Sequence, residues 1–412
     1  MYESLAILGC FIFIYSLVCR RLEQTPVNGA VVFMLFGLMV GPVGLNWLKV
    51  DVHADALSLL AELTLAFLLF TDAANADLRI LEKNYQLPQR LLLIGLPLTI
   101  LLGFGVGVLL FDSFQLIEVA ILATILAPTD AALGKAVVTN KSVPGRIRES
   151  LNVESGLNDG LCVPVLFILL AVEVGFQSDV KTPAMAVTKM VESIGIGMLV
   201  GFGLTFCAYW MIKICALKGW VSETWRQLPV LALALMCLSV AEMLGGSGFI
   251  ACFCGGLLFD RVETGHKKKL LLAAEGTGDT LALITWILFG ALIVGNVIGT
   301  FTWRMIVYGL LSLSLIRMLP VFICLSGAGL RAADKLFMGW FGPRGLASIV
   351  FAVIVFNHKI PHTHDVSMTV ICTILMSILA HGLSANPCVR RVFKQYEAKG
   401  QPDESTGSSC LR

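Results

Sequence analysis

A nine-residue run, Asn-Val-Glu-Ser-Gly-Leu-Asn-Asp-Gly at 152–160, places several oxygen-bearing side chains within little more than one helical turn. Because positions four apart share a helix face, Ser155 should stack with Asp159, and Glu154 with Asn158. A hydroxyl beside a carboxylate suits a hard cation that prefers oxygen ligands. The run therefore predicts an ion-binding face, and the alternative is a structural polar cluster between helices.

A second polar pair, Thr129-Asp130, follows Pro128 in the apolar stretch 116–138. Proline has no N–H and disfavours helical geometry in the residue before it, so a helix through this stretch should break here. In a membrane a broken backbone must face protein or water, and a carboxylate beside the break can bind an ion. The alternative is a packing kink with an incidental aspartate.

A third interruption, Phe341-Gly342-Pro343-Arg344-Gly345, lies in the apolar stretch 334–356 and carries a cation. Another cation, Arg317, lies deep in the apolar stretch 303–325. An unpaired arginine in such a setting is costly, so Arg317 should have a carboxylate partner. Glu154 is the predicted partner.

The composition indicates that these charges lie in a membrane. The 412 residues are 57% hydrophobic and only 14% charged, whereas soluble domains carry about 25% charged residues. Charges at membrane depth are rare and usually functional. Asp72 and Glu242 lie near the ends of their apolar stretches, where snorkelling or helix capping is the simpler interpretation. The net charge of +2 gives no support for nucleic-acid binding, and the cysteines lack metal-binding spacing.

Thirteen apolar segments approach the length needed to cross a bilayer core, which takes about 20 residues of helix. They are residues 4–18, 29–48, 56–75, 91–111, 116–138, 150–174, 189–212, 228–244, 247–260, 276–297, 303–325, 334–356 and 366–386. We therefore expect an all-α polytopic membrane protein with about 13 transmembrane helices. Residues 1–390 should form the transmembrane domain, and residues 391–412 a short polar cytoplasmic tail.

The distribution of lysine and arginine over the connecting segments supports this count. Alternate connections hold most of the basic residues, and the intervening ones hold only Lys49, Lys181, Lys189, Arg304 and Lys359. Cytoplasmic loops are enriched in lysine and arginine. The N-terminus is therefore expected outside and the C-terminus in the cytoplasm, and the membrane is expected to be a bacterial inner membrane.

The two interrupted segments are the fifth and the twelfth in order. If segments 1–6 and 8–13 are two six-helix repeats, these segments are equivalent, and the odd offset gives them opposite orientations. Paired broken helices in inverted repeats mark the substrate site of many secondary transporters. The repeat is inferred from the order of the segments, because the residues themselves show no clear repeat.

Several motifs together resemble the NhaP-type sodium/proton antiporters of the cation:proton antiporter superfamily. They are Ala127-Pro128-Thr129-Asp130, the run 154–160, Arg317, Gly342-Pro343-Arg344-Gly345 and the thirteen-segment order. The resemblance covers about residues 1–390 and implies a homodimer with an NhaA/NhaP-like antiporter fold, in which two discontinuous helices cross. Ala131 and Pro343 depart from the family pattern, which often has proline and leucine at those places, and the position near Asp72 is often glutamate. An interruption remains close to both breaks, so the crossing is still expected.

By this resemblance, Asp159 should bind the cation and the proton alternately, and Na⁺ should be held by Asp159, Ser155 and Thr129. The full predicted set of cation- and proton-binding residues is Asp159, Asp130, Thr129, Ser155 and Asn158. Glu154 and Arg317 would form a structural ion pair, and Arg344 would neutralise charges near the crossing. Asn158 stands where electrogenic relatives have a second aspartate, which implies electroneutral exchange of one proton for one cation.

The chain is therefore expected to be a transporter, not an enzyme, with no cofactor. It would exchange Na⁺, or Li⁺, for H⁺ by alternating access, with membrane lipid and a second copy of the chain as partners. The closest alternative is a K⁺/H⁺ antiporter with the same site, and a more remote one is a sodium-coupled solute symporter of related fold. An intramembrane aspartyl protease would need Tyr-Asp and Gly-x-Gly-Asp motifs, and neither Asp130 nor Asp159 lies in one.

Overall fold

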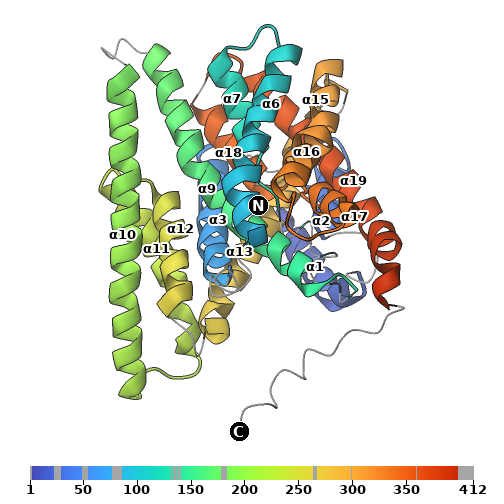
Figure 1. Ribbon diagram of the computed structural model, residues 1–412. Coiled ribbons are helices and arrows are strands. Elements are labelled where there is room, and N and C mark those ends of the chain that lie inside the picture. Colours follow the sequence, from blue (N-terminus) through green and yellow to red (C-terminus); the bar gives the residue numbers. More distant parts are fainter. Residues whose placement is uncertain are drawn as a thin grey trace.

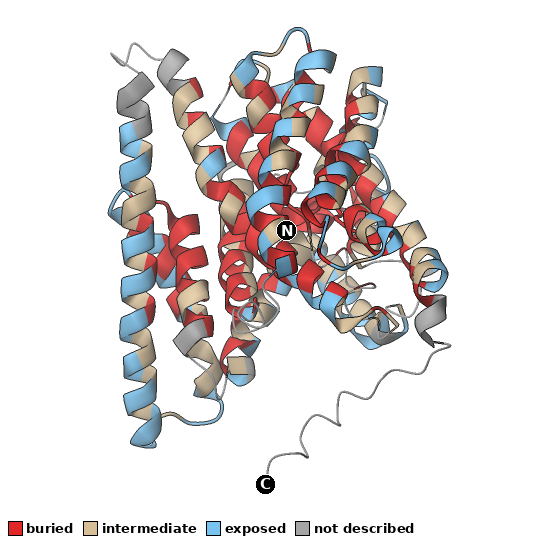
Figure 2. Cartoon of the chain, in the orientation of Figure 1, coloured by how far each residue is buried: buried red, intermediate tan, exposed pale blue. Residues whose placement is uncertain are grey.

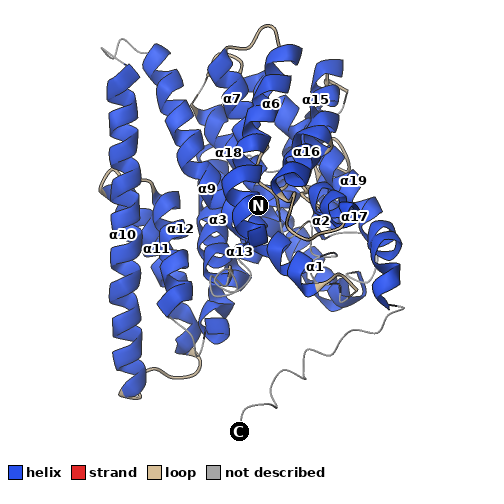
Figure 3. Cartoon of the chain, viewed as in Figure 1, coloured by secondary structure: helices blue, strands red, loops and turns tan. Residues whose placement is uncertain are grey.

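Helices account for all the regular secondary structure that the computed structural model describes (Figure 3). The described residues are 2–22, 29–48, 54–76, 86–130, 133, 137, 140, 142–177, 183–262, 267–297, 299–358 and 360–397. The polar end of the predicted tail and Ala131 therefore lie outside the described residues.

The described part of the first half of the chain contains six helices or continuous helical runs. They are α1 (Tyr2–Leu22), α2 (Gly29–Val40), α3 (Ala54–Asn75), the continuous run α5 (Gln86–Arg90), η1 (Leu91–Gly95) and α6 (Leu96–Leu110), then α7 (Leu116–Ile125) and α9 (Gly145–Gln177). The segment η1 is a π-helical turn, and Pro97 stands directly after it at the start of α6. Proline interrupts the regular helical hydrogen-bond ladder, and π-helical turns accommodate such irregularities.

The second half contains the remaining helices. They are α10 (Pro183–Leu217), the short η2 (Trp225–Gln227) leading into α11 (Leu228–Met243), α12 (Gly248–Val262), the run α13 (Lys267–Leu288), η3 (Phe289–Val294) and α14 (Gly295–Val297), then α15 (Trp303–Leu313), α16 (Leu315–Cys324), α17 (Ala332–Trp340), α18 (Leu346–Asn357) and α19 (Thr363–Glu397). The helix α19 continues past residue 390, the predicted end of the transmembrane domain.

The helices agree with the predicted membrane segments. Among the described residues, nine helices are long and apolar enough to span a membrane, and four further apolar helices are shorter. Every predicted segment coincides with one of these helices. The all-helical fold is thus confirmed, while the count of thirteen membrane crossings stays a prediction because length and composition alone place the spans.

The helices are arranged around a central group formed by α3, α9 and α18 (Figure 1). On one side α12 packs between α3 and α10, with α11 beside it, and α10 stands at the edge of the molecule. On the other side α18 packs against α19, and α19 packs against α15. The candidate site residues of α9, of the segment after α7 and of the segment before α18 are therefore surrounded by other helices.

The surface carries many large apolar side chains and the interior contains charged ones, which is the opposite of the usual arrangement in a soluble protein. The helix α10 is largely exposed or half-buried along its length (Figure 2). Its large apolar side chains, including Leu199 and Met211, are exposed, whereas Glu154, Arg317 and Arg344 are buried. Burying a charge is costly unless it is paired or hydrogen-bonded, while lipid tails are a favourable environment for exposed apolar side chains. This distribution fits a chain that is surrounded by lipid and keeps its charges for internal contacts.

Candidate ion-binding site

Two helices stop in the middle of the molecule, as predicted at Pro128 and Pro343. The helix α7 ends at Ile125, and residues 126–130 are not helical. The helix α17 ends at Trp340, and α18 begins at Leu346 after five non-helical residues. Proline removes a backbone donor and disfavours helical geometry in the residue before it, which accounts for both breaks.

Asp130 joins the two breaks. Its backbone N–H donates to the carbonyl oxygen of Pro343 at 2.8 Å, so the broken stretches are in direct contact. Its carboxylate accepts the N–H of Leu346, the first residue of α18, at 2.9 Å, and that of Leu133 at 3.1 Å. A carboxylate at a helix N-terminus satisfies free donors and complements the helix dipole. Asp130 thus holds the crossing together.

The close approach at the crossing depends on a glycine. A Cβ atom added to Gly345 would collide with the carboxylate of Asp130. A second link comes from Ser348 of α18, whose hydroxyl donates to the carbonyl of Ile125 at 2.8 Å. This bond satisfies a carbonyl at the end of α7 that the break leaves without its helical donor. The C-terminal end of α7 and the N-terminal end of α18 are therefore held in contact.

Thr129 is held by the polar face of α9. Its hydroxyl lies 2.9 Å from the hydroxyl of Ser155 and accepts a hydrogen bond from the Asn158 side-chain amide at 2.8 Å. All three residues are buried. The structure therefore brings together the hydroxyl groups that the sequence placed 26 positions apart.

Asp159 lies beside this group on α9 and is 9% exposed. Within the described part of the chain, its Oδ1 atom and the Oδ1 atom of Asn158 are buried and have no hydrogen-bond partner. A buried oxygen without a partner is costly, so atoms of this kind indicate a place where an ion, a proton or water supplies the missing interaction. Both atoms belong to the residues that were predicted to bind the cation.

Asp72 joins the site, contrary to the interpretation as a snorkelling or capping residue. A Cβ atom on Gly156 would lie 3.3 Å from the Asp72 carbonyl oxygen and 3.6 Å from its Cβ, so α3 and α9 meet at these two residues. The carboxylates of Asp72 and Asp130 both interact electrostatically with Asp159. The sequence signal that was available is Gly156 itself, which permits a second backbone to approach.

Glu242, by contrast, is a capping residue, as the sequence indicated. Its Oε1 atom accepts the N–H of Gly248, the first residue of α12, at 2.8 Å. The site therefore gathers one of the two acidic residues that were interpreted as helix-end groups.

The predicted ion pair is present. Arg317 Nη2 donates to Glu154 Oε2 at 2.8 Å, and Arg317 Nη1 lies 2.6 Å from Oε1. Both side chains are at most 2% exposed. Two parallel contacts between a guanidinium and a carboxylate are the strongest geometry for such a pair, and they offset the cost of burying both charges. The pair joins α9 to α16.

Arg344 lies at the second break and is fully buried. Its Nη1 atom donates to the carbonyl of Gly342 at 2.7 Å, and its backbone N–H donates to the hydroxyl of Ser377 at 2.7 Å. Its charge interacts with that of Glu154. Its guanidinium thus complements a carbonyl group of the break, and its neutralising role near the crossing stays a prediction.

Sequence reasoning missed Glu118 at the other end of α7. Its carboxylate is completely buried and accepts hydrogen bonds from the backbone N–H and the Nδ1 atom of His362, both at 2.8 Å. It also accepts the N–H of Gln115 at 2.8 Å, which is one half of a capping box. The pair of a polar residue with a glutamate three positions later was the available signal.

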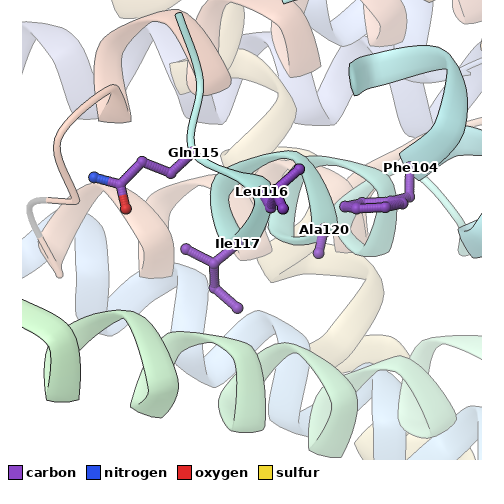
Figure 4. A pocket seen from close by; sticks show the side chains of 5 residues that line it. All are labelled: Phe104, Gln115, Leu116, Ile117 and Ala120. Atoms are coloured by element: carbon purple, nitrogen blue, oxygen red, sulfur yellow. The ribbon is translucent and has the colours of Figure 1, made fainter. Parts of the chain in front are cut away.

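A groove of about 490 Å³ lies near this end of α7 (Figure 4). It is lined by Phe104, Gln115, Leu116, Ile117 and Ala120. Gln115 is the one polar residue in this lining, and none of the predicted site residues belongs to it. The groove therefore has none of the charged oxygen ligands that the crossing provides.

Known proteins that are similar to this chain are ion antiporters. Residues 7–391 match the family described as "Sodium/hydrogen exchanger, transmembrane". A Na⁺/H⁺ antiporter of Saccharomyces cerevisiae is 28% identical over 86% of this chain, and the match covers 38% of that protein. The K⁺/H⁺ antiporter NhaP2 of Shewanella sp. strain ANA-3 is 21% identical over 91% of this chain and 64% of its own length. This chain thus matches less than two thirds of the length of these relatives.

A solved structure shares the fold. The sodium proton antiporter MjNhaP1 from Methanocaldococcus jannaschii superposes with a TM-score of 0.76, covering 95% of this chain and 99% of that one at 20% identity. The predicted NhaA/NhaP-like fold is therefore confirmed, and the all-helical chain is an integral membrane protein.

Proposed function

Because this chain belongs to the sodium/hydrogen exchanger family, we propose that it exchanges a monovalent cation for a proton across a membrane. The observation that carries the proposal is the pair of buried oxygens, Asp159 Oδ1 and Asn158 Oδ1, that have no partner among the described residues. They lie beside the hydrogen-bonded hydroxyls of Thr129 and Ser155, at the crossing of two broken helices. Oxygen ligands of this kind suit Na⁺ or Li⁺ as well as a proton.

The exchange follows from competition for one carboxylate. Asp159 would bind either the proton or the cation, because both interact with the same carboxylate oxygens. Asn158 is neutral and its amide donates to Thr129, so Asp159 is the one titrating group of this adjacent pair and would carry one positive charge in each direction. Exchange would therefore be electroneutral, one proton for one cation. It should slow as the pH falls, because protons then keep the carboxylate occupied.

The arrangement of the helices supports inverted repeats and alternating access. In the proposed repeats the fourth span is equivalent to the eleventh, and the fifth to the twelfth. The fourth span contains the π-helical turn η1, and the eleventh is interrupted at Ser314, between α15 and α16. The fifth and twelfth are the two broken helices. Irregularities thus recur in two pairs of corresponding spans, although η3 of the tenth span has no counterpart in α3. The site would face one side of the membrane at a time.

The proposed setting completes the function. The chain would lie in a bacterial inner membrane as a homodimer, with the N-terminus outside and the C-terminus in the cytoplasm. Residues 1–390 would form the transport domain and residues 391–412 the polar cytoplasmic tail. Existing proton gradients would drive the exchange.

K⁺ is the second candidate cation, and the observation that favours it is the name of the NhaP2 relatives, which are K⁺/H⁺ antiporters. The site uses hydroxyl, amide and carboxylate oxygens, which both alkali cations accept. The choice between them depends on the size of the coordination shell during transport.

Purified protein in liposomes tests the function. A Na⁺ gradient should drive a pH change in the lumen, at the same rate whether or not a membrane potential is imposed, and more slowly at low pH. The same assay with Li⁺ and K⁺ ranks the cations. A rate that follows the imposed potential would contradict electroneutrality, and the lack of any cation-driven pH change would contradict antiport.

A further inference from the structure

The second broken span lacks one helical backbone hydrogen bond, between Arg344 and Trp340. Both groups of that missing bond are hydrogen-bonded to side chains of the same neighbouring helix, α19. In an uninterrupted helix the N–H of Arg344 would donate to the carbonyl of Trp340, four residues earlier. Here the N–H of Arg344 donates to the hydroxyl of Ser377 at 2.7 Å. The carbonyl of Trp340 lies 2.7 Å from Nε2 of His381. Ser377 and His381 are one turn apart on α19.

The imidazole is oriented by its own helix. Nδ1 of His381 lies 3.2 Å from the hydroxyl of Ser377 and 2.8 Å from the carbonyl of Ser377. Because a carbonyl can only accept, Nε2 must carry a hydrogen to bond Trp340. In the neutral ring Nδ1 then accepts from the Ser377 hydroxyl, and in the protonated ring it donates to the Ser377 carbonyl. The bond to Trp340 is available in both states.

Ser377 and His381 are both buried, at 0% and 2% exposure. Water therefore cannot take the place of the hydrogen bonds that they make. The same helix also accepts the indole N–H of Trp340, through Ser384 at 2.8 Å. The carbonyl of Trp340 takes the N–H of Gly342 as well, at 2.9 Å. The end of α17 and the break that follows it are therefore tied to α19 by three side chains of that helix.

This anchoring extends directly to the crossing. The residue before Arg344 is Pro343, whose carbonyl accepts the N–H of Asp130. Two residues after Arg344 is Leu346, whose N–H donates to the carboxylate of Asp130. The position of Arg344 thus sets the positions of Pro343 and Leu346, the two partners of Asp130. Thr129 directly precedes Asp130 in the chain.

We propose that Ser377 and His381, called here the α19 pair, are positioning residues for cation exchange. They take the donor and the acceptor of the missing Arg344–Trp340 hydrogen bond, and they keep Asp130 and Thr129 in register with Asp159. The pair has the same spacing as Ser155 and Asp159, which are also four residues apart on the helix that follows the other broken span. One half of the protein would bind the ion with this spacing, and the other half would use it to support the break.

The inference rests on the proposed exchange function, and steady-state kinetics in proteoliposomes test it. Replacing Ser377→Ala or His381→Phe should raise the KM for the cation roughly tenfold, the effect expected for one buried hydrogen bond. His381→Gln should stay within about twofold of the wild type, because its amide N–H reaches the position of Nε2 and keeps the donor to the carbonyl of Trp340. The KM of the double variant should not exceed that of the more impaired single variant, since both residues act on one interrupted bond.

Thr369→Ala is the matched control. Thr369 is a fully buried hydroxyl on α19 that donates to the Asp365 carbonyl of its own helix. Its replacement should leave the KM unchanged. If His381→Phe does not fold, His381→Asn replaces it, because the shorter amide keeps the contact with Ser377 but does not reach Trp340.

The outcomes separate this inference from the proposed function. A wild-type protein with no cation-driven proton movement would overturn the function. A wild-type protein that exchanges, together with Ser377→Ala and His381→Phe variants of unchanged KM, would overturn only the role of the α19 pair. Equal KM increases for Thr369→Ala would do the same, since they would indicate general core damage. Equal increases for His381→Gln and His381→Phe would also do so, since they would indicate that the hydrogen bond to Trp340 does not set the KM.

Discussion

At the scale of single residues, the site divides its polar groups by the partners that they already have. Asp130 has its carboxylate occupied by backbone N–H groups, and Glu154 is occupied by Arg317. Asp159 is the acidic side chain of this group that has a buried oxygen without a partner among the described residues. The residue with an available oxygen is the one suited to bind and release an ion, and the others maintain its surroundings.

Asp159→Asn tests this division. The amide keeps the size of the side chain but cannot take up a proton or carry a negative charge, so Na⁺-driven pH changes in everted vesicles should fall to background. Asp365→Asn is the control, because Asp365 is about half exposed at the start of α19 and should retain wild-type exchange. Robust exchange by Asp159→Asn would show that another group carries the proton.

At the scale of elements, the two breaks work as a unit because each supplies what the other lacks. The segment after α7 provides a carboxylate and a backbone N–H, and the segment before α18 provides a carbonyl and a free helix N-terminus. Such contacts need the backbones to approach closely, which is the reason for glycine at position 345. The irregular segments are thus as specifically packed as the helices around them.

Gly345→Ala should separate the breaks. The added methyl group would collide with the carboxylate of Asp130, displacing it from Leu346. A misplacement near 1 Å in a catalytic arrangement can cost on the order of 100-fold in rate, and a loss of that order is expected in the liposome assay. Gly203→Ala in α10 is the control, since a Cβ there meets no atom within 4 Å. An active Gly345→Ala protein would mean that the crossing tolerates a wider spacing.

At the scale of the whole molecule, the two halves of the chain are joined through buried polar contacts. Glu154 belongs to the first proposed repeat and Arg317 to the second, as do Asp130 and Leu346 respectively. Apolar contacts between transmembrane helices compete with equally apolar lipid, so polar links contribute specificity to how helices associate. The Glu154–Arg317 pair is the strongest of these links by charge and geometry.

Glu154→Gln should therefore destabilise the fold. It leaves Arg317 buried without its counter-charge, which typically costs about 3–5 kcal/mol. Thermal unfolding in detergent measures the effect as a lower midpoint. Asp112→Asn is the matched control, because it breaks the pair between Asp112 and Arg304, whose side chains are 74% and 38% exposed, and exposed pairs contribute about 1 kcal/mol or less. Equal shifts for both variants would refute a special role for the buried pair.

The sequence alone determined the features that follow from local composition. Apolar stretches located the helices, proline and glycine located both breaks, and the cost of burying an unpaired charge led to the contact between Arg317 and Glu154. The spacing on α9 also predicted that Ser155 and Asp159 share a face. Each of these follows from neighbours within about one helical turn, or from a charge that must find an opposite charge.

The tertiary structure decided the rest, because it depends on which helices pack together. It brought Asp72 against Gly156, gave Asp130 its partners across the crossing, and gave His381 a place in the second break. A histidine or an aspartate in an apolar stretch has many possible partners, and only packing selects one. The run 152–160, which as a sequence was a face of polar groups, became in the structure one carboxylate and one amide that each keep an available oxygen, beside neighbours that are already bonded.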